Sequence, residues 1–292
     1  MTVSVVIPTR DRKEMAEAAI RSVLQQTRPV EQIVVIDDGS APSYANYLRT
    51  LSPMIEVHDC PVSRGASAAR NLGLERVRGD HVLFLDDDDL VNARFVEDGL
   101  AVLDARKDVG AVTFLSDRIV ATTGAAGADR SNPVEKAFLE ERPITAFLRF
   151  LIPIHSTLVR RDAIGDLRFP EDLRQGEDTV FWIRLAARGC RFAFDPRVNA
   201  SVRYHEGNTT RSRARYVEEI QPCYERLLAE GLLTDRDDAY LAHLKLAWFK
   251  VLTGRPGRLH HLAQLLRRPD LALRELGFWS GNLWRRPLKR DR

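Results

Sequence analysis

The hydrophobic pattern in the first half of the chain alternates between strand-like and helix-like stretches. Residues 3–7, 33–36 and 55–58 are short apolar runs rich in β-branched side chains, which is typical of strands buried on both faces of a sheet. Between the first two runs, apolar residues recur at helical spacing at Ala16, Ala19, Ile20, Val23 and Leu24. A strand, a helix and a second strand in close succession predict a right-handed βαβ unit, whose ligands gather at the carboxyl ends of the strands.

The same alternation continues to about residue 115. Residues 44–51 predict a short helix, and the small side chains of residues 65–69 begin another. The apolar run 82–85 predicts a further buried strand, which is followed by a helix over 93–105 and a strand over 110–115. The first part of the chain is therefore expected to be an α/β domain with a mostly parallel sheet.

The pattern weakens in the second half of the chain. Residues 116–143 combine glycine, proline and small polar side chains, which predicts a loop or a poorly ordered insertion that acts as a lid. The elements expected after it are a helix over 144–151, a strand over 156–159, a helix from the acidic pair Glu177–Asp178 to Gly189, and edge strands over 192–194 and 200–204.

Beyond Arg215 the apolar positions indicate helices to the end of the chain. Thr234 and Asp237 form a predicted capping pair before an apolar-rich helix over 240–252. From Arg268 onward, aromatic side chains are mixed with arginine and lysine. That mixture suits an amphipathic segment on an anionic membrane surface, and it also suits a helical layer with a solvated basic tail.

Composition narrows the class of protein. With 292 residues, 44% of them hydrophobic, the chain can build one large or two modest domains with a substantial core. The net charge of +3 is too small to indicate a nucleic-acid partner. Cys60, Cys190 and Cys223 are widely spaced, which favours free thiols in a reducing compartment. No leader pattern and no apolar run of about 18 residues is visible, so we expect a cytoplasmic protein without a membrane span.

Four consecutive carboxylates, Asp86 to Asp89, follow directly after the apolar run 82–85. Acidic side chains crowded at the end of a buried strand repel one another, and a divalent cation with a preference for oxygen ligands relieves that repulsion. The ordinary alternative is an acidic turn whose charges are screened by water. Because Asp37 and Asp38 end another predicted strand at the same edge of the sheet, we favour a ligand site.

Small residues at the start of the helix near residue 66 add to this expectation. Gly65 to Ala69 would let the helix N-terminus approach a phosphate closely, and the same residues would also pack the helix against the sheet. Both roles are compatible.

Five motifs, in this order, resemble those of the family 2 glycosyltransferases with the GT-A fold. They are VSVVIPTRDR, IVVIDDGS, SRGASAARNLGL, VLFLDDDD and GEDTVFWIRLAARG, and they cover about the first 210 residues. The resemblance implies a Rossmann-like, mixed and mostly parallel sheet flanked by helices, with a C-terminal helical extension. The implied catalytic domain is 1–215, with a nucleotide-sugar half of about 1–115 and an acceptor half of about 116–215, and the helical region is 216–292.

The resemblance also implies roles for individual residues. Contacts to the nucleotide sugar are expected from Pro8, Thr9, Arg10, Asp37, Asp38, Arg64, Asp86 and Asp87. Asp86 and Asp88 match the family's metal-binding motif for Mn²⁺ or Mg²⁺, with Asp88 as the direct ligand and His205 as a further one; Asp87 and Asp89 leave the register open by one residue. Asp178 matches the general base and Glu177 supports it, although Asp178 could also simply cap the helix that follows.

The implied reaction is transfer of a sugar from a UDP-, dTDP- or GDP-sugar to a hydroxyl of a glycan, a lipid-linked acceptor or a small molecule. One displacement assisted by a base inverts the anomeric configuration. We therefore expect a bacterial polysaccharide or glycolipid enzyme, cytoplasmic or peripheral on the inner face of the membrane. Two alternatives stay open: a non-catalytic sugar-nucleotide-binding descendant of the fold, and a metal-dependent nucleotidyltransferase. A receiver domain and a dehalogenase-like phosphatase fit less well, because each needs its acidic pair after a different strand.

Overall fold

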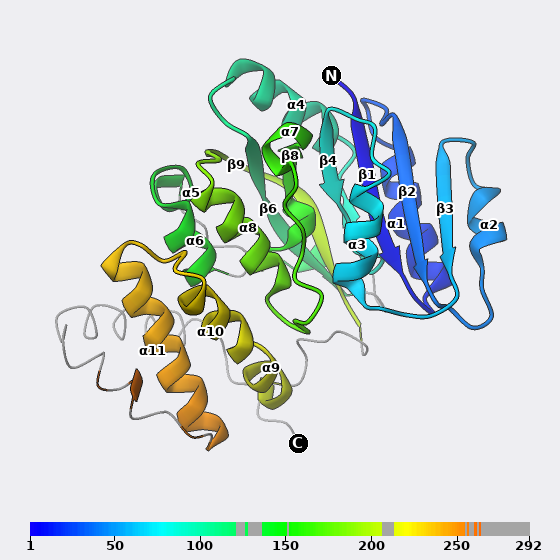
Figure 1. Ribbon diagram of the computed structural model, residues 1–292. Coiled ribbons are helices and arrows are strands. Elements are labelled where there is room, and N and C mark those ends of the chain that lie inside the picture. Colours follow the sequence, from blue (N-terminus) through cyan, green and yellow to red (C-terminus); the bar gives the residue numbers. More distant parts are fainter. Residues whose placement is uncertain are drawn as a thin grey trace. The chain divides into compact units, whose positions relative to one another are not determined.

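The computed structural model describes residues 1–120, 126–127, 136–150, 152–205, 213–254, 256, 260–261 and 263 (Figure 1). The chain divides into two compact units, Met1–Arg211 and Ser212–Arg292. The first unit contains the sheet, and the second consists of helices where it is described.

Within the described residues, nine strands form one sheet in the order β3-β2-β1-β4-β8-β6-β9-β5, with β7 paired to β6. The strands are β1 Val3–Thr9, β2 Gln32–Asp38, β3 Ile55–Cys60, β4 His81–Phe84, β5 Asp89–Val91, β6 Ala111–Val120, β7 Ala126–Gly127, β8 Thr157–Arg160 and β9 Phe192–Tyr204. β3, β2, β1 and β4 run parallel, whereas β8 pairs antiparallel with both β4 and β6. The expected mixed α/β sheet flanked by helices is confirmed.

The helices of the first unit are interspersed with these strands along the chain (Figure 1). They are α1 Lys13–Leu24, α2 Ala45–Arg49, α3 Ala66–Leu74, α4 Phe95–Ala105, α5 Lys136–Glu141, α6 Pro143–Arg149, α7 Arg161–Ile164 and α8 Glu177–Ala187, with a 3₁₀ turn at Ile154–Ser156. The second unit contains α9 Arg213–Glu219, α10 Gln221–Ala229 and α11 Arg236–Thr253.

Both faces of the parallel strands are buried, which explains why their sequences are continuously apolar. On one face, Val5 and Ile7 of β1 pack with Ile20 of α1. On the other face, Ile36 of β2 packs with Ala69 of α3. Burial of each such aliphatic side chain stabilises the fold by about 1.5–3 kcal/mol. This packing fixes the strands in register, so the polar residues at or just after the carboxyl ends of β1, β2 and β4 emerge at one edge.

An aromatic cluster positions α8 over the sheet. Phe84 at the end of β4 contacts Phe169 and Phe181 with ring centroids 5.0 Å and 5.7 Å apart. Phe169 and Phe181 stack on each other at 4.0 Å. Offset and edge-on aromatic pairs add about 0.5–1.5 kcal/mol beyond their buried area. Because Phe84 lies two residues before Asp86, the cluster sets the first turn of α8 near the acidic run.

Two sequence predictions for the second half of the sheet were wrong. β6 does not stop at Leu115 but continues through Ser116 to Val120, and β7 and α5 occupy part of the stretch interpreted as a loop. Polar residues can continue a strand here because β9 pairs with β6 along its length. The remainder of the proposed lid, residues 121–125 and 128–135, lies outside the described residues.

The two predicted edge strands are a single strand, β9, which lies between β6 and β5. Its pairing with β6 skips Pro196 and Arg197, because Phe114 pairs with Asp195 and Leu115 with Val198. A bulge of this kind accommodates a proline, which lacks the N–H that a regular strand pairing needs. The short strand β5, which covers the other side of β9, was not anticipated.

In the second unit, the expected helices after Arg215 are confirmed as far as the chain is described. The predicted cap is displaced by one residue: Asp235, not Thr234, precedes α11, and its carboxylate accepts a hydrogen bond of 2.7 Å from the Asp237 N–H. The amphipathic segment from Arg268 lies outside the described residues. Among the helices that are described, none is both long and apolar enough to cross a bilayer.

Candidate active site

The first carboxylate of the acidic run, Asp86, is paired with an arginine from α3. Arg70 is 3% exposed, and its guanidinium donates to Asp86 at 2.6 Å and to Glu177 at 2.9 Å. Burial opposes ionisation of Asp86, but the charge and hydrogen bond of Arg70 prevail and lower its pKa. One buried cation therefore joins the end of β4 to the first turn of α8.

The second carboxylate, Asp87, faces the end of β1. It accepts a hydrogen bond of 2.7 Å from the Thr9 hydroxyl, whose oxygen lies 2.6 Å from the hydroxyl of Tyr44. Arg12 donates to Asp87 at 3.1 Å. Burial raises the pKa of Asp87 to about 6, and the neighbouring charge of Asp88 adds to the effect, against the hydrogen bond from Thr9.

Asp88 receives two further basic groups. The Arg12 guanidinium donates to its carboxylate at 2.9 Å, and Nε2 of His205 lies 3.1 Å away. His205 thus reaches the acidic run from just beyond the end of β9, the strand that precedes it.

Asp89 is held by a histidine that sequence reasoning missed. Nδ1 of His155, which is 1% exposed, lies 2.9 Å from the Asp89 carboxylate. The Arg203 N–H donates to the same carboxylate at 3.1 Å, while its guanidinium donates to the backbone carbonyls of Asp87 and Asp88 at 2.7 Å and 2.8 Å. β9 therefore fixes the backbone of the acidic run as well as one of its side chains.

The donor set fits a divalent cation. Asp86, Asp88 and Asp89 each offer an oxygen within 4.8 Å of the others. Clustered carboxylate oxygens are the ligands that Mg²⁺ and Mn²⁺ prefer. Asp87 is directed instead to Thr9 and Arg12. The sequence left the register between Asp87 and Asp89 open, and this geometry brings Asp89 rather than Asp87 into the group.

The two acids at the end of β2 hold the adjoining loops, including the loop before α3. Asp38 accepts from the Ser63 hydroxyl at 2.6 Å and from the N–H groups of Arg64 and Gly65, both at 2.8 Å. Gly65 adopts a φ of +92°, a backbone conformation that residues other than glycine rarely adopt. Asp37 is fully buried and accepts from the Ser40 N–H at 3.1 Å. These two carboxylates thus shape the carboxyl-terminal edge of the sheet beside β2.

The remaining predicted donor-site residues differ in their surroundings. Pro8 lies within β1 and pairs with Ile36 of β2. Arg10 is exposed and forms an ion pair of 3.3 Å with Asp11. Arg64 is exposed as well and pairs with Glu171 at 2.7 Å. The ion pairs of both arginines thus lie outside the acidic run.

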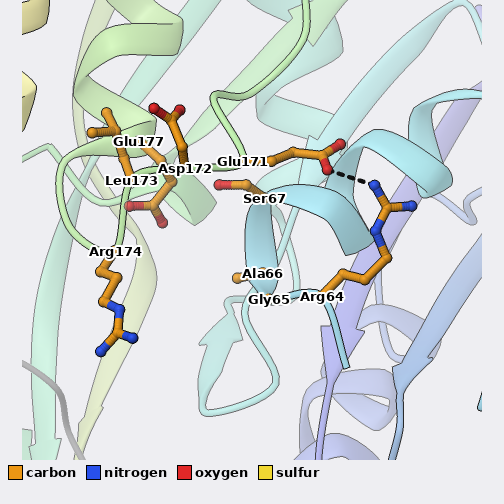
Figure 2. A pocket seen from close by; sticks show the side chains of 9 residues that line it. All are labelled: Arg64, Gly65, Ala66, Ser67, Glu171, Asp172, Leu173, Arg174 and Glu177. Atoms are coloured by element: carbon orange, nitrogen blue, oxygen red, sulfur yellow. Dashed lines mark hydrogen bonds and ion pairs between the residues drawn. The ribbon is translucent and has the colours of Figure 1, made fainter. Parts of the chain in front are cut away.

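A cavity of about 360 Å³ opens between the start of α3 and the segment before α8. It is lined by Arg64, Gly65, Ala66, Ser67, Glu171, Asp172, Leu173, Arg174 and Glu177. Figure 2 shows Arg64 and Glu171 paired at its rim. Since Glu177 also bonds Arg70, the cavity adjoins the arginine that binds Asp86.

Asp178 occupies the first turn of α8 and is partly buried. Its carboxylate accepts a hydrogen bond of 2.6 Å from the N–H of Thr179. Burial raises the pKa of Asp178 to about 7, and the neighbouring charge of Glu177 adds to this, against the opposing charge of Arg70. A carboxylate of this kind changes its protonation state near neutral pH.

The structure adds Arg12, Arg70, His155 and Arg203 to the residues singled out by sequence. Arg70 stands in the quoted motif SRGASAARNLGL, so a charged residue among small, helix-packing ones was the available signal. His155 lies in a 3₁₀ turn and carries no comparable signal.

Comparison with known proteins gives three kinds of match. The family model described as Glycosyl transferase family 2 matches residues 4–167. A putative teichuronic acid biosynthesis glycosyltransferase, TuaG of Bacillus subtilis, is 26% identical over 193 residues, which are 64% of this chain and 73% of TuaG. The poly(ribitol-phosphate) beta-N-acetylglucosaminyltransferase TarS of Staphylococcus aureus is 27% identical over 198 residues, which are 63% of this chain but 32% of TarS.

Solved structures share the fold. A crystal structure of TarS residues 1–349 with UDP has a TM-score of 0.60 at 20% identity and covers 85% of this chain and 70% of that one. A mannosyltransferase from Pyrobaculum calidifontis in complex with GDP-Man and Mn²⁺ has a TM-score of 0.62 at 20% identity, covering 95% and 79%.

Proposed function

The chain belongs to glycosyl transferase family 2, and from that premise we propose that it transfers a sugar from a nucleoside-diphosphate sugar to a hydroxyl acceptor with inversion of the anomeric carbon. The observation that carries the proposal is the bridge made by Arg70. Its hydrogen bonds of 2.6 Å to Asp86 and 2.9 Å to Glu177 hold the acidic run and the start of α8 together. The edge of the sheet that would bind the donor and the base at the start of α8 would then lie on either side of the same sugar.

On the donor side, we assign the nucleoside and diphosphate to the carboxyl ends of β1, β2 and β4. Ligands of parallel sheets bind at this edge. The contacts would come from Pro8, Thr9, Arg10, Asp37, Asp38, Arg64, Asp86 and Asp87. Structural neighbours bind UDP and GDP-Man, which supports a nucleotide-sugar donor without fixing its base or sugar.

Asp86, Asp88 and Asp89, with His205 beside Asp88, are the residues that would hold Mn²⁺ or Mg²⁺. When bound, such an ion neutralises the negative charge that develops on a departing diphosphate. Arg12, which contacts Asp87 and Asp88, supplies a further positive charge beside the same carboxylates.

We assign the general base to Asp178. Its carboxylate accepts the proton of the acceptor hydroxyl as that oxygen bonds to the anomeric carbon, and the bond from that carbon to the diphosphate oxygen breaks with its electron pair. A base is most effective when its pKa lies near the working pH, and the pKa of Asp178 is about 7. Glu177 supports it by anchoring the first turn of α8 to Arg70.

For the acceptor, we propose a glycan or a lipid-linked glycan, handled at the cytoplasmic side of a membrane. The support is the naming of TuaG for teichuronic acid biosynthesis and of TarS for poly(ribitol-phosphate). This chain spans about a third of the length of TarS.

A thermal-shift screen of UDP-, dTDP- and GDP-sugars, with and without Mn²⁺, tests the proposal. A ligand at 100 times its Kd stabilises the folded state by about 2.7 kcal/mol, which is readily measured. We expect one donor to give a metal-dependent shift that Asp88→Asn abolishes and Asp166→Asn, a change to an exposed acid paired with Arg188, leaves intact. A shift without turnover would favour the non-catalytic alternative. A product of retained configuration would contradict the role of Asp178.

A further inference from the structure

Three histidines gather in the second unit, remote in sequence from the acidic run. His243 lies on α11, which ends at Thr253, and His260 and His261 follow that end. Nδ1 of His243 lies 3.0 Å from Nδ1 of His261, and one ring nitrogen from each of the three residues lies within 4.8 Å of the others. The three ring centroids are 5.2–6.1 Å apart.

We propose that His243, His260 and His261 form a binding site for a divalent transition-metal ion of the Zn²⁺ class. Imidazole nitrogen is the commonest protein ligand for such ions. A tetrahedral ion with metal–nitrogen distances of about 2.0–2.1 Å holds its ligand nitrogens roughly 3.4 Å apart, so the observed spacing needs only a small adjustment. Three protein ligands leave a fourth position for water or an external group.

The three rings differ in their exposure to solvent. His261 is buried, His243 is half-buried and His260 is exposed. On the same helix as His243, Lys250 forms an ion pair of 2.7 Å with Glu225.

This site differs in chemistry from the acidic one. Carboxylate oxygens at Asp86, Asp88 and Asp89 suit Mg²⁺ or Mn²⁺, whereas three imidazoles suit Zn²⁺, Co²⁺, Ni²⁺ or Cu²⁺. Binding would also fasten residues 260–261 to the middle of α11. Because a ligand that binds only the folded state stabilises it, occupancy is expected to raise the melting temperature of this unit.

The experiment is calorimetric titration of Zn²⁺ into the full-length, tag-free chain after treatment with a chelator, with Co²⁺ absorption as a second readout. We expect Zn²⁺ to bind at this site and Co²⁺ to give visible bands of nitrogen coordination. His260→Ala changes an exposed side chain and should weaken Zn²⁺ binding at least tenfold. The double variant His243→Ala/His261→Ala should bind one equivalent of Zn²⁺ fewer than the parent.

Matched controls separate this site from the proposed active site. Asp88→Asn should leave the Zn²⁺ equivalent in place, and so should His58→Ala, which removes a histidine of β3. Circular dichroism verifies that each variant is folded. No Zn²⁺ binding by the parent chain, or the same stoichiometry and affinity in His260→Ala and the double variant, would show that the three rings merely pack and hydrogen-bond together. Loss of the equivalent in Asp88→Asn would place the ion at the acidic run and equally overturn the proposal.

Discussion

The acidic run Asp86–Asp89 and the acidic pair Glu177–Asp178 meet at one place but are compensated very differently. Each carboxylate of the run contacts a basic side chain: Arg70, Arg12, His205 or His155. In the pair, Arg70 reaches Glu177, while the hydrogen bonds that Asp178 accepts come from Thr179. The pKa of Asp86, which Arg70 contacts, is lowered, whereas the pKa of Asp178 is raised to about 7. Within the run, burial also raises the pKa of Asp87 to about 6 despite its contact with Arg12. Unequal compensation separates an acid that stays ionised from one that can exchange a proton.

The strongest way to break this comparison is to remove Asp178, the acid of the pair whose pKa is raised to about 7. Asp178→Asn keeps the shape of the side chain but loses the proton acceptor, so we expect kcat to fall by about 10²–10⁴-fold. Asp166→Asn, at an exposed aspartate, should change kcat by less than about twofold. Turnover measured with the donor identified by thermal shift provides the comparison. Equal activity of Asp178→Asn and the parent would remove the general-base role.

The next largest effect is expected from the shared cation. Arg70→Met leaves Asp86 and Glu177 without their buried partner, and breaking a buried ion pair in this way costs about 3–5 kcal/mol. Urea unfolding at neutral pH measures the loss. Arg76→Met, a change at a half-exposed arginine just beyond α3, should cost less than about 1 kcal/mol. Similar losses in the two variants would mean that the Arg70 bridge contributes no special stability.

The pH dependence sharpens the contrast further. Asp178 accepts a proton only when ionised, and its pKa is about 7. We expect kcat/KM to fall about tenfold per pH unit below a midpoint near pH 7. A bound cation favours the ionised form of Asp178 and would move this midpoint to a lower pH. The stability effect has the opposite sign. Because folding raises the pKa of this acid, its ionisation destabilises the fold progressively as pH rises from about 4 toward 7.

A paired measurement checks both signs. Asp178→Asn should melt higher than the parent at pH 8, and the difference should shrink at pH 5, where Asp178 is protonated in the folded parent. If the difference in melting temperature between Asp178→Asn and the parent were larger at pH 5 than at pH 8, the raised pKa would belong to another group.

The smallest effect concerns Arg12, which is partly exposed and contacts Asp87 and Asp88. Its positive charge competes with a cation for the same carboxylates. Arg12→Gln should therefore tighten Mn²⁺ binding in the absence of nucleotide, by about two- to fivefold, as expected for a partly screened charge. Titration followed by electron paramagnetic resonance measures the affinity. Arg10→Gln, which removes a neighbouring charge paired with Asp11, is the matched control.

The sequence was informative where one kind of physical signal dominated. β1, β2 and β4 were predicted because both faces are buried, so their runs are continuously apolar. The extension of β6 was missed because Ser116, Asp117 and Arg118 are polar, and only their pairing with β9 makes them a strand. The gathering of the acids at one edge of the sheet was expected because they lie at the carboxyl ends of predicted strands.

The distribution of partners among those acids could not be predicted. Asp87 and Asp89 are equivalent in the sequence, yet one faces Thr9 and the other His155, because β1 and the 3₁₀ turn approach from different sides. The bridge by Arg70 depends on how α3 and α8 pack relative to the end of β4, which no local pattern encodes.

The double attachment of Arg70 has an evolutionary consequence. A substitution at position 86 or 177 leaves the buried guanidinium of Arg70 with one of its two carboxylate partners missing. A change at position 70, 86 or 177 is therefore expected to be tolerated only when the other two positions change with it. Among relatives, positions 70, 86 and 177 should therefore covary as a triplet, although they lie in three separate elements of the fold.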